Sequence, residues 1–301
     1  MAGRWSSRVW TILICAGLCI LYAAVSWTAI SNKSATWDEP GHAVTGWLML
    51  WRHDYRLSPD VPPLWEDWVA LPTSPDALLF DPDSPHYTNL HSKDDLFFWI
   101  VQTLYHTPGN DPIDLVNRGR MMCLILAVAL AILIGRWGWA LGGPIVAIAA
   151  TFLYCLDPNF LGHGSLVKND VAFTLLYFAA AYAMWRVGRR LTVGNVIALL
   201  VLTAAAFAVK LSGVLLAPVL VIGLLARALM HEPWNMVGSD VTSRGKKIAV
   251  VVGICVAAII VTYIGLWASY GFRYDAGPNG MRSDTTYYVQ LLRSRQILVQ
   301  T

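Results

Sequence analysis

Long apolar runs recur along most of this 301-residue sequence, and they constrain its fold more than any other feature. A helix needs about 20 apolar residues to cross a hydrocarbon core of roughly 30 Å, where each backbone amide must be satisfied within its own segment. Seven runs are expected spans: 9–30, 121–136, 142–156, 171–187, 193–209, 212–230 and 248–270. We therefore expect an all-α polytopic membrane protein. Only 14% of the residues are charged, against about 25% in soluble domains.

The first apolar run follows Arg4 and Arg8 and could be read as a signal peptide. Its apolar core is longer than the roughly 7–15 residues of such a segment, and further apolar runs follow it. We interpret it as a retained first span.

Basic residues gather in the connections on one side of the expected topology. They are Arg4, Arg8, Arg136, Arg186, Arg189, Arg190, Arg227, Arg244, Lys246 and Lys247. The positive-inside rule places this side, and with it the N-terminus, in the cytoplasm. The small net charge of +3 gives no reason to expect a nucleic-acid partner.

The opposite, outer side receives one long loop at about residues 31–119, which holds 13 of the 19 acids. Apolar residues follow helical spacing in two stripes within it. The stripes are Val44, Trp47, Leu48, Trp51 and Leu96, Trp99, Ile100, Leu104. We expect two amphipathic helices at the membrane interface, where tryptophan is favoured. The chain is expected to form one domain, 1–301, ending in an outer segment, 271–301.

Asp38 and Glu39 stand side by side where the first span meets this loop. Pro40 suits the first turn of a helix, so both acids are expected at a helix N-terminus. One interpretation is helix capping, because acids there satisfy free N–H groups. The other is chemical, since a carboxylate at the membrane face could serve as a general base.

Asp170 and Lys210 are expected on the same outer face, each at the edge of an apolar run. An acid at the edge of hydrocarbon is a functional candidate, and capping is the alternative for Asp170. Lys210 could bind a phosphate or simply extend to the interface. Three distant segments thus bring charged residues to one face.

Histidines are frequent in the outer loops, but none has the tight spacing of metal ligands. They are His42, His53, His86, His91, His106 and His163. Most are expected to be ordinary polar loop residues. A divalent metal bound by Asp38, Glu39 and a histidine is left as an open alternative.

Four segments together resemble the GT-C membrane glycosyltransferases, in the branch of protein O-mannosyltransferases, aminoarabinose transferases and lipopolysaccharide-modifying relatives. They are the Asp38-Glu39 pair, GWLMLWRHDYRLSPDVPPL (46–64), LDPNFLGHGSLVKNDV (156–171) and AFAVKLSGVLLAPVL (206–220). The resemblance covers roughly residues 10–275. Where relatives often carry Lys after Pro-Pro-Leu, this chain has Glu66 and Asp67.

The resemblance implies inverting transfer of a sugar from a polyprenyl-phosphate donor to a lipid, glycan or protein acceptor. Asp38 would be the base, and Glu39 would orient the acceptor or Asp38. Asp170 and His163 would line the polar pocket, and Lys210 would hold the lipid phosphate. We hypothesise that Lys168 supplies the charge missing after Pro-Pro-Leu. The implied location is the bacterial inner membrane.

Two other functions fit the sequence. The chain could be a non-catalytic or truncated GT-C-like subunit that binds a polyprenyl lipid or a partner chain, since relatives typically continue with further spans. A secondary transporter is the weaker alternative, because the clear acids lie at one face and not in the middle of spans.

Overall fold

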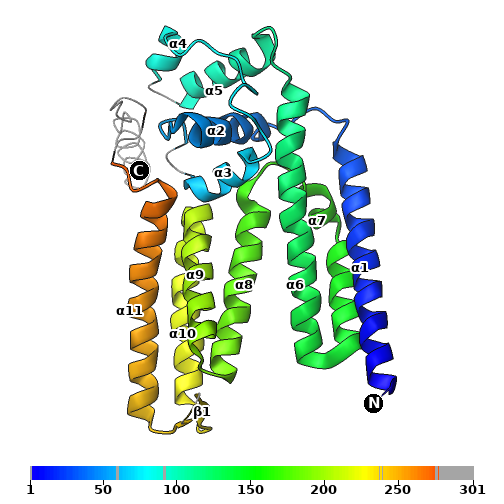
Figure 1. Ribbon diagram of the computed structural model, residues 1–301, viewed down its shortest axis with the longest axis vertical. Coiled ribbons are helices and arrows are strands. Elements are labelled where there is room, and N and C mark those ends of the chain that lie inside the picture. The colour runs from blue at the N-terminus through cyan, green and yellow to red at the C-terminus, as the bar shows by residue number, and fades with distance from the viewer. Residues whose placement is uncertain are drawn as a thin grey trace, which may run out of the picture.

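Short helices lie across one end of a bundle of long helices in the computed structural model, which describes residues 2–58, 61–90, 93–236, 238, 240–274 and 277 (Figure 1). The long helices are α1 (Ala2–Ile30), α6 (Pro112–Cys155), α8 (Asn169–Arg189), α9 (Val193–Val209), α10 (Leu216–Leu229) and α11 (Arg244–Ser269). We call the short ones at this end the end layer: α2 (Glu39–Arg52), α3 (Pro63–Ala70), α4 (Pro85–Thr88), α5 (Lys93–Val101) and the π-helical turn η1 (Gln102–His106).

Connecting elements are few and short. They are α7 (Pro158–His163), the 3₁₀ turn η2 (Leu211–Leu215), and the two-residue strands β1 (Trp234–Asn235) and β2 (Asp240–Val241). The strands pair at the end of the bundle remote from the end layer (Figure 1). The expected outer segment 271–301 lies outside the described residues, apart from 271–274 and 277.

Five helical segments are long and apolar enough to cross a membrane, which supports the expected class of all-α membrane protein. They are Ser7–Ile30, Pro112–Cys155, Asn169–Arg189, Leu211–Leu229 and Arg244–Ser269. Helix α9 is equally apolar but shorter, with 17 residues.

Helix α6 is a hairpin of two antiparallel arms. The chain leaves helical geometry at Gly142 (φ −146°, ψ 17°) and Gly143 (φ 73°, ψ −154°), and Pro144 begins the second arm. The Tyr154 hydroxyl donates to the Ala127 carbonyl at 2.9 Å, which ties the arms together. The expected segments 121–136 and 142–156 are these two arms.

The first arm of α6 begins at Pro112, well before the expected start at residue 121. The Asp111 carboxylate accepts from the N–H groups of Ile113 and Asp114, both at 3.0 Å, and so caps the helix. Leu115 and Val116 are then buried against the end layer. The helix therefore extends beyond the bundle, because its first turns pack into the core of the end layer.

The end layer has a core of its own, which takes in both predicted amphipathic helices. Val44, Trp47 and Leu48 are fully buried, and Trp99 and Ile100 are nearly so. They pack in one cluster with residues from α3, from the first arm of α6 and from the loop before α8. The structure has helices at both positions, and most of each apolar stripe faces protein.

Helices α2 and α3 approach closely at Gly46. A Cβ built there would lie 2.6 Å from the backbone oxygen of Glu66, closer than packed atoms allow. A Cβ at Gly41, on the same helix, would have no described atom within 4 Å. The contact therefore requires glycine at position 46 only.

We predict that Gly46→Ala destabilises the protein by about 1–3 kcal/mol, because the added methyl overpacks the contact between α2 and α3. Gly41→Ala is the matched control and should be neutral or stabilising by up to about 1 kcal/mol, because alanine favours helix. Thermal unfolding in detergent measures both. Equal midpoints for the two variants would contradict the close contact.

Candidate functional site

A buried ion pair joins the start of α2 to the first arm of α6. The Arg120 guanidinium donates from Nε and Nη2 to the two carboxylate oxygens of Glu39, each at 2.8 Å. The side chains are 2% and 0% exposed. Arg120 also donates to the carbonyls of Ile30, Lys33 and Ser34. One side chain thereby fixes the whole connection from α1 to α2.

Glu39 has further donors on the opposite side. The backbone N–H groups of Thr36 (2.8 Å) and Val167 (3.1 Å) donate to its carboxylate. Burial by itself would raise the pKa of Glu39, but Arg120 and these N–H groups together hold the pKa below its usual value. Glu39 is therefore ionised, and it holds α2 to the loop before α8.

The sequence interpretation missed Arg120. A usable signal was present, since an arginine that opens a long apolar run needs an acidic partner to offset the cost of its burial. Nothing local identified Glu39 as that partner, because 81 positions separate the two residues.

Asp38 lies next to Glu39 but has different surroundings. Its side chain is 51% exposed and its Oδ2 lies 3.3 Å from Nζ of Lys168. It makes no side-chain capping bond at the start of α2. The capping interpretation therefore does not describe Asp38, and its carboxylate is accessible to a ligand.

A second ion pair lies beside the first. Nζ of Lys210, at the junction of α9 and η2, is 2.5 Å from Oδ1 of Asp170 in the first turn of α8. All four charged side chains are accessible, between 28% and 65% exposed. Ion pairs this exposed typically contribute about 0–1 kcal/mol, so a charged ligand could replace either partner at low cost.

The loop that carries Lys168 is attached to α1. The Tyr22 hydroxyl donates to the Phe160 carbonyl at 2.8 Å, and the Ser26 hydroxyl donates to the Leu161 carbonyl at 3.2 Å. With the Val167 bond to Glu39, these contacts hold the loop at both of its ends. Residues expected to meet from three distant segments do meet, at the end of the bundle that the end layer covers (Figure 1).

A cavity of about 380 Å³ opens beside Asp38. Its walls come from the start of α2, from the stretch after α2 and from α5; they are Trp37, Asp38, Gly41, His42, Thr45, Leu57, Ser58, Val61, Leu96, Phe97 and Ile100. Trp37 and Phe97 stack at 4.2 Å between ring centroids. The volume and the mostly apolar lining with a few polar groups are typical of small-molecule sites.

Glu66 and Asp67, which stand where relatives often carry lysine, turn toward the interior of the end layer. Nδ1 of His42 lies 2.9 Å from Oε1 of Glu66, whose side chain is fully buried. Burial, and next the charge of Glu66, raise the pKa of Asp67 to about 7. Oδ1 of Asp67 is buried without a hydrogen-bond partner among the described atoms.

No described contact places His163 or a metal ion at the two ion pairs. His163 ends α7 with an exposed side chain, and no described interaction joins it to the two ion pairs. Over the described ranges, no group of three His, Cys, Asp or Glu side chains could hold a metal ion. Both oxygens of Glu39 are already occupied by Arg120 and backbone donors.

Comparison of the chain with protein-family models, with curated proteins and with solved structures finds no match. Inference about function therefore depends on the residues of this site alone.

We predict that Glu39→Gln and Arg120→Met each destabilise the protein by about 3–5 kcal/mol, because each leaves a buried charge without its partner. The double variant should cost less than the sum of the two. Asp114→Asn is the matched control, because Asp114 pairs with Arg118 on the same helix in an exposed setting. Thermal unfolding in detergent measures all four, and additive losses would contradict the coupling.

We also predict a pH dependence centred on Asp67. Its pKa is raised from 3.8 to about 7, so folding favours the protonated carboxyl, and stability falls as pH rises through that window. Asp67→Asn should stabilise the protein by about 1–3 kcal/mol at pH 8 and have little effect near pH 4.

Unfolding midpoints measured from pH 4 to pH 8 test this. Asp76→Asn, at an exposed acid of the same layer, should leave the pH dependence unchanged. A pH profile that is identical in wild type and Asp67→Asn would contradict the assignment.

Proposed function

We propose that the protein is a membrane glycosyltransferase that moves a sugar from a polyprenyl-phosphate donor to an acceptor hydroxyl at the outer face. One observation supports this above the others. An accessible carboxylate, Asp38, lines a cavity and is paired with Lys168, and Asp170, two residues further along the chain from Lys168, is paired with Lys210. These two pairs support a site in which Asp38 acts as the base and the lysines bind the phosphate.

In the proposed reaction Asp38 takes the proton from the acceptor hydroxyl as that oxygen attacks the anomeric carbon. The bond from this carbon to the phosphate oxygen breaks on the opposite face, so the configuration inverts. The bond electrons leave with the polyprenyl phosphate. Lys168 and Lys210 would stabilise the charge of that leaving group, which is the type of electrostatic contribution that lowers such barriers most.

The remaining site residues have supporting roles in this proposal. Glu39 is a positioning residue, because its contacts fix the start of α2 and thereby the place of Asp38. Asp170 positions Lys210. His163, exposed on the loop before α8, would contact the sugar only if the donor reaches that far.

The proposed topology has seven crossings, with the N-terminus in the cytoplasm of a bacterial inner membrane. The crossings are α1, the two arms of α6, α8, α9, η2 with α10, and α11. The end layer then lies outside, where a lipid-linked donor would present its sugar. This agrees with the concentration of basic residues at the opposite end of the bundle.

A second candidate is a non-catalytic subunit that binds a polyprenyl lipid. The observation that favours it is that both lysines are already paired with acids, Lys168 with Asp38 and Lys210 with Asp170. A carboxylate oxygen that contacts Lys168 is not free to meet an acceptor hydroxyl. Turnover therefore requires the donor phosphate to draw Lys168 away from Asp38.

The deciding experiment uses the full chain in proteoliposomes with a panel of radiolabelled polyprenyl-phosphate hexoses and pentoses. We expect wild type to release polyprenyl phosphate and transfer the sugar from at least one donor. Asp38→Asn should lower the rate by about 10²–10⁴, the usual contribution of general base catalysis. Lys168→Ala should lower it by about 10²–10³, the cost of one lost electrostatic contact.

Asp76→Asn serves as the control and should transfer at the wild-type rate. Transfer that survives Lys168→Ala unchanged would rule out the proposed phosphate role. Donor binding without any turnover in wild type would contradict the enzyme and favour the lipid-binding subunit. Full transfer by Asp38→Asn would contradict Asp38 as the base.

A further inference from the structure

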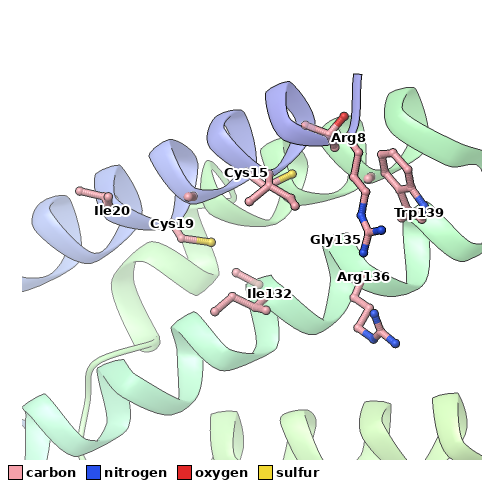
Figure 2. Close-up of a pocket in the computed structure, with 13 residues that line it drawn as sticks. Arg8, Cys15, Cys19, Ile20, Ile132, Gly135, Arg136 and Trp139 are labelled. Carbon is pink, nitrogen blue, oxygen red and sulfur yellow. The ribbon is translucent and has the colours of Figure 1, made fainter. Parts of the chain in front are cut away.

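A second cavity lies at the other end of the molecule, between α1 and the first arm of α6 (Figure 2). Its volume is about 500 Å³. The lining is mostly apolar and consists of Arg8, Thr11, Ile12, Cys15, Ala16, Cys19, Ile20, Ala131, Ile132, Gly135, Arg136, Trp139 and Ala147. Two arginines are the charged residues of this set, and Thr11 and Trp139 add polar groups.

Both arginines line the same end of this cavity. Figure 2 shows the side chain of Arg8 extending from α1 toward α6, where it ends near Gly135 and beside Trp139, whereas the side chain of Arg136 extends from α6 in the direction away from α1. Neither guanidinium has an ion-pair partner among the residues that the structure describes, and no acid lines the cavity. Two cations at one end of a cavity without an acid attract an anion, and an anion bound between them offsets their mutual repulsion.

The apolar end of the cavity has a different character. Ile12, Ile20 and Ile132 line it, and all three are exposed on the outside of the bundle. They belong to segments apolar enough to cross a membrane, so the surface they share faces hydrocarbon. The cavity therefore has an apolar part that is open to lipid and, near the helix ends, a part lined by two cations.

This combination matches one chemical class, an anionic phospholipid. A guanidinium presents a planar set of donors that fits a phosphate. Tryptophan is favoured at the level of lipid headgroups, and basic pockets between helix ends bind anionic headgroups. A soluble phosphate would leave the apolar part of the cavity unused.

We propose that this cavity binds an anionic phospholipid of the leaflet opposite the end layer. The headgroup phosphate lies between Arg8 and Arg136, and one acyl chain follows the isoleucines along α1 and α6. The site is separate from the Asp38 site, at the far end of the bundle, and it does not depend on the proposed transferase activity.

Native mass spectrometry of the full chain in mild detergent tests the proposal. The probes are phosphatidylglycerol and phosphatidylethanolamine with identical acyl chains. We expect wild type to retain phosphatidylglycerol preferentially. Arg8→Gln combined with Arg136→Gln should reduce its affinity by roughly fivefold for each arginine removed, while affinity for phosphatidylethanolamine stays the same.

Arg190→Gln combined with Arg244→Gln is the matched control, because it removes two exposed arginines from the same end of the bundle but outside the cavity. It should bind phosphatidylglycerol as wild type does. Ala16→Phe narrows the apolar part of the cavity and leaves both arginines in place. It should therefore lower the affinity for both lipids. Circular dichroism checks that each variant is folded.

Equal retention of the two lipids by wild type would overturn the proposal. So would a loss of phosphatidylglycerol that is the same in the cavity variant and in the control. Displacement of phosphatidylglycerol by an excess of inorganic phosphate would show a site for soluble anions and would also overturn it.

Discussion

The ion pair between Glu39 and Arg120 is buried, and everything around the candidate site depends on it. Removing two charges from water costs several kcal/mol for each ion, and the cost is offset only where geometry and further hydrogen bonds are both good. Here the pair is bidentate, and carbonyls from the α1–α2 connection and N–H groups from two loops satisfy the remaining atoms. The pair consequently holds α1, α2, α6 and the loop before α8 in one arrangement.

The charged residues at the candidate site fall into a buried pair and two exposed pairs. Glu39 and Arg120 are inaccessible and hold the backbone in place, whereas Asp38, Lys168, Asp170 and Lys210 are accessible and weakly coupled. Neighbouring residues of the same chemistry, Asp38 and Glu39, fall on opposite sides of this division. A rigid support beneath replaceable contacts is the arrangement that a site for a charged ligand requires.

Much of this could be read from the sequence, because apolar length and helical periodicity are local properties. The long helices, the amphipathic α2 and α5, and the gathering of Asp38, Lys168, Asp170 and Lys210 at one end all followed from them. The partner of Glu39 could not be read, since Arg120 is distant in sequence. The start of α6 was also missed. The helix begins before its apolar run because Leu115 and Val116 pack into the core of the end layer, which the apolar run alone does not indicate.

Arg120 and Arg136 bound the uncharged stretch of the first arm of α6. The fifteen residues between them correspond to about 22 Å of helix, which is shorter than a hydrocarbon core of roughly 30 Å. Because Arg120 is fixed by its ion pair, it cannot move outward to relieve the difference. If this arm crosses the bilayer as proposed, the mismatch is absorbed at the other end, by thinning of the bilayer beside α6 or by extension of Arg136 toward the headgroups. In the proposed topology, the length of one helix therefore sets the depth at which the whole end layer stands above the membrane.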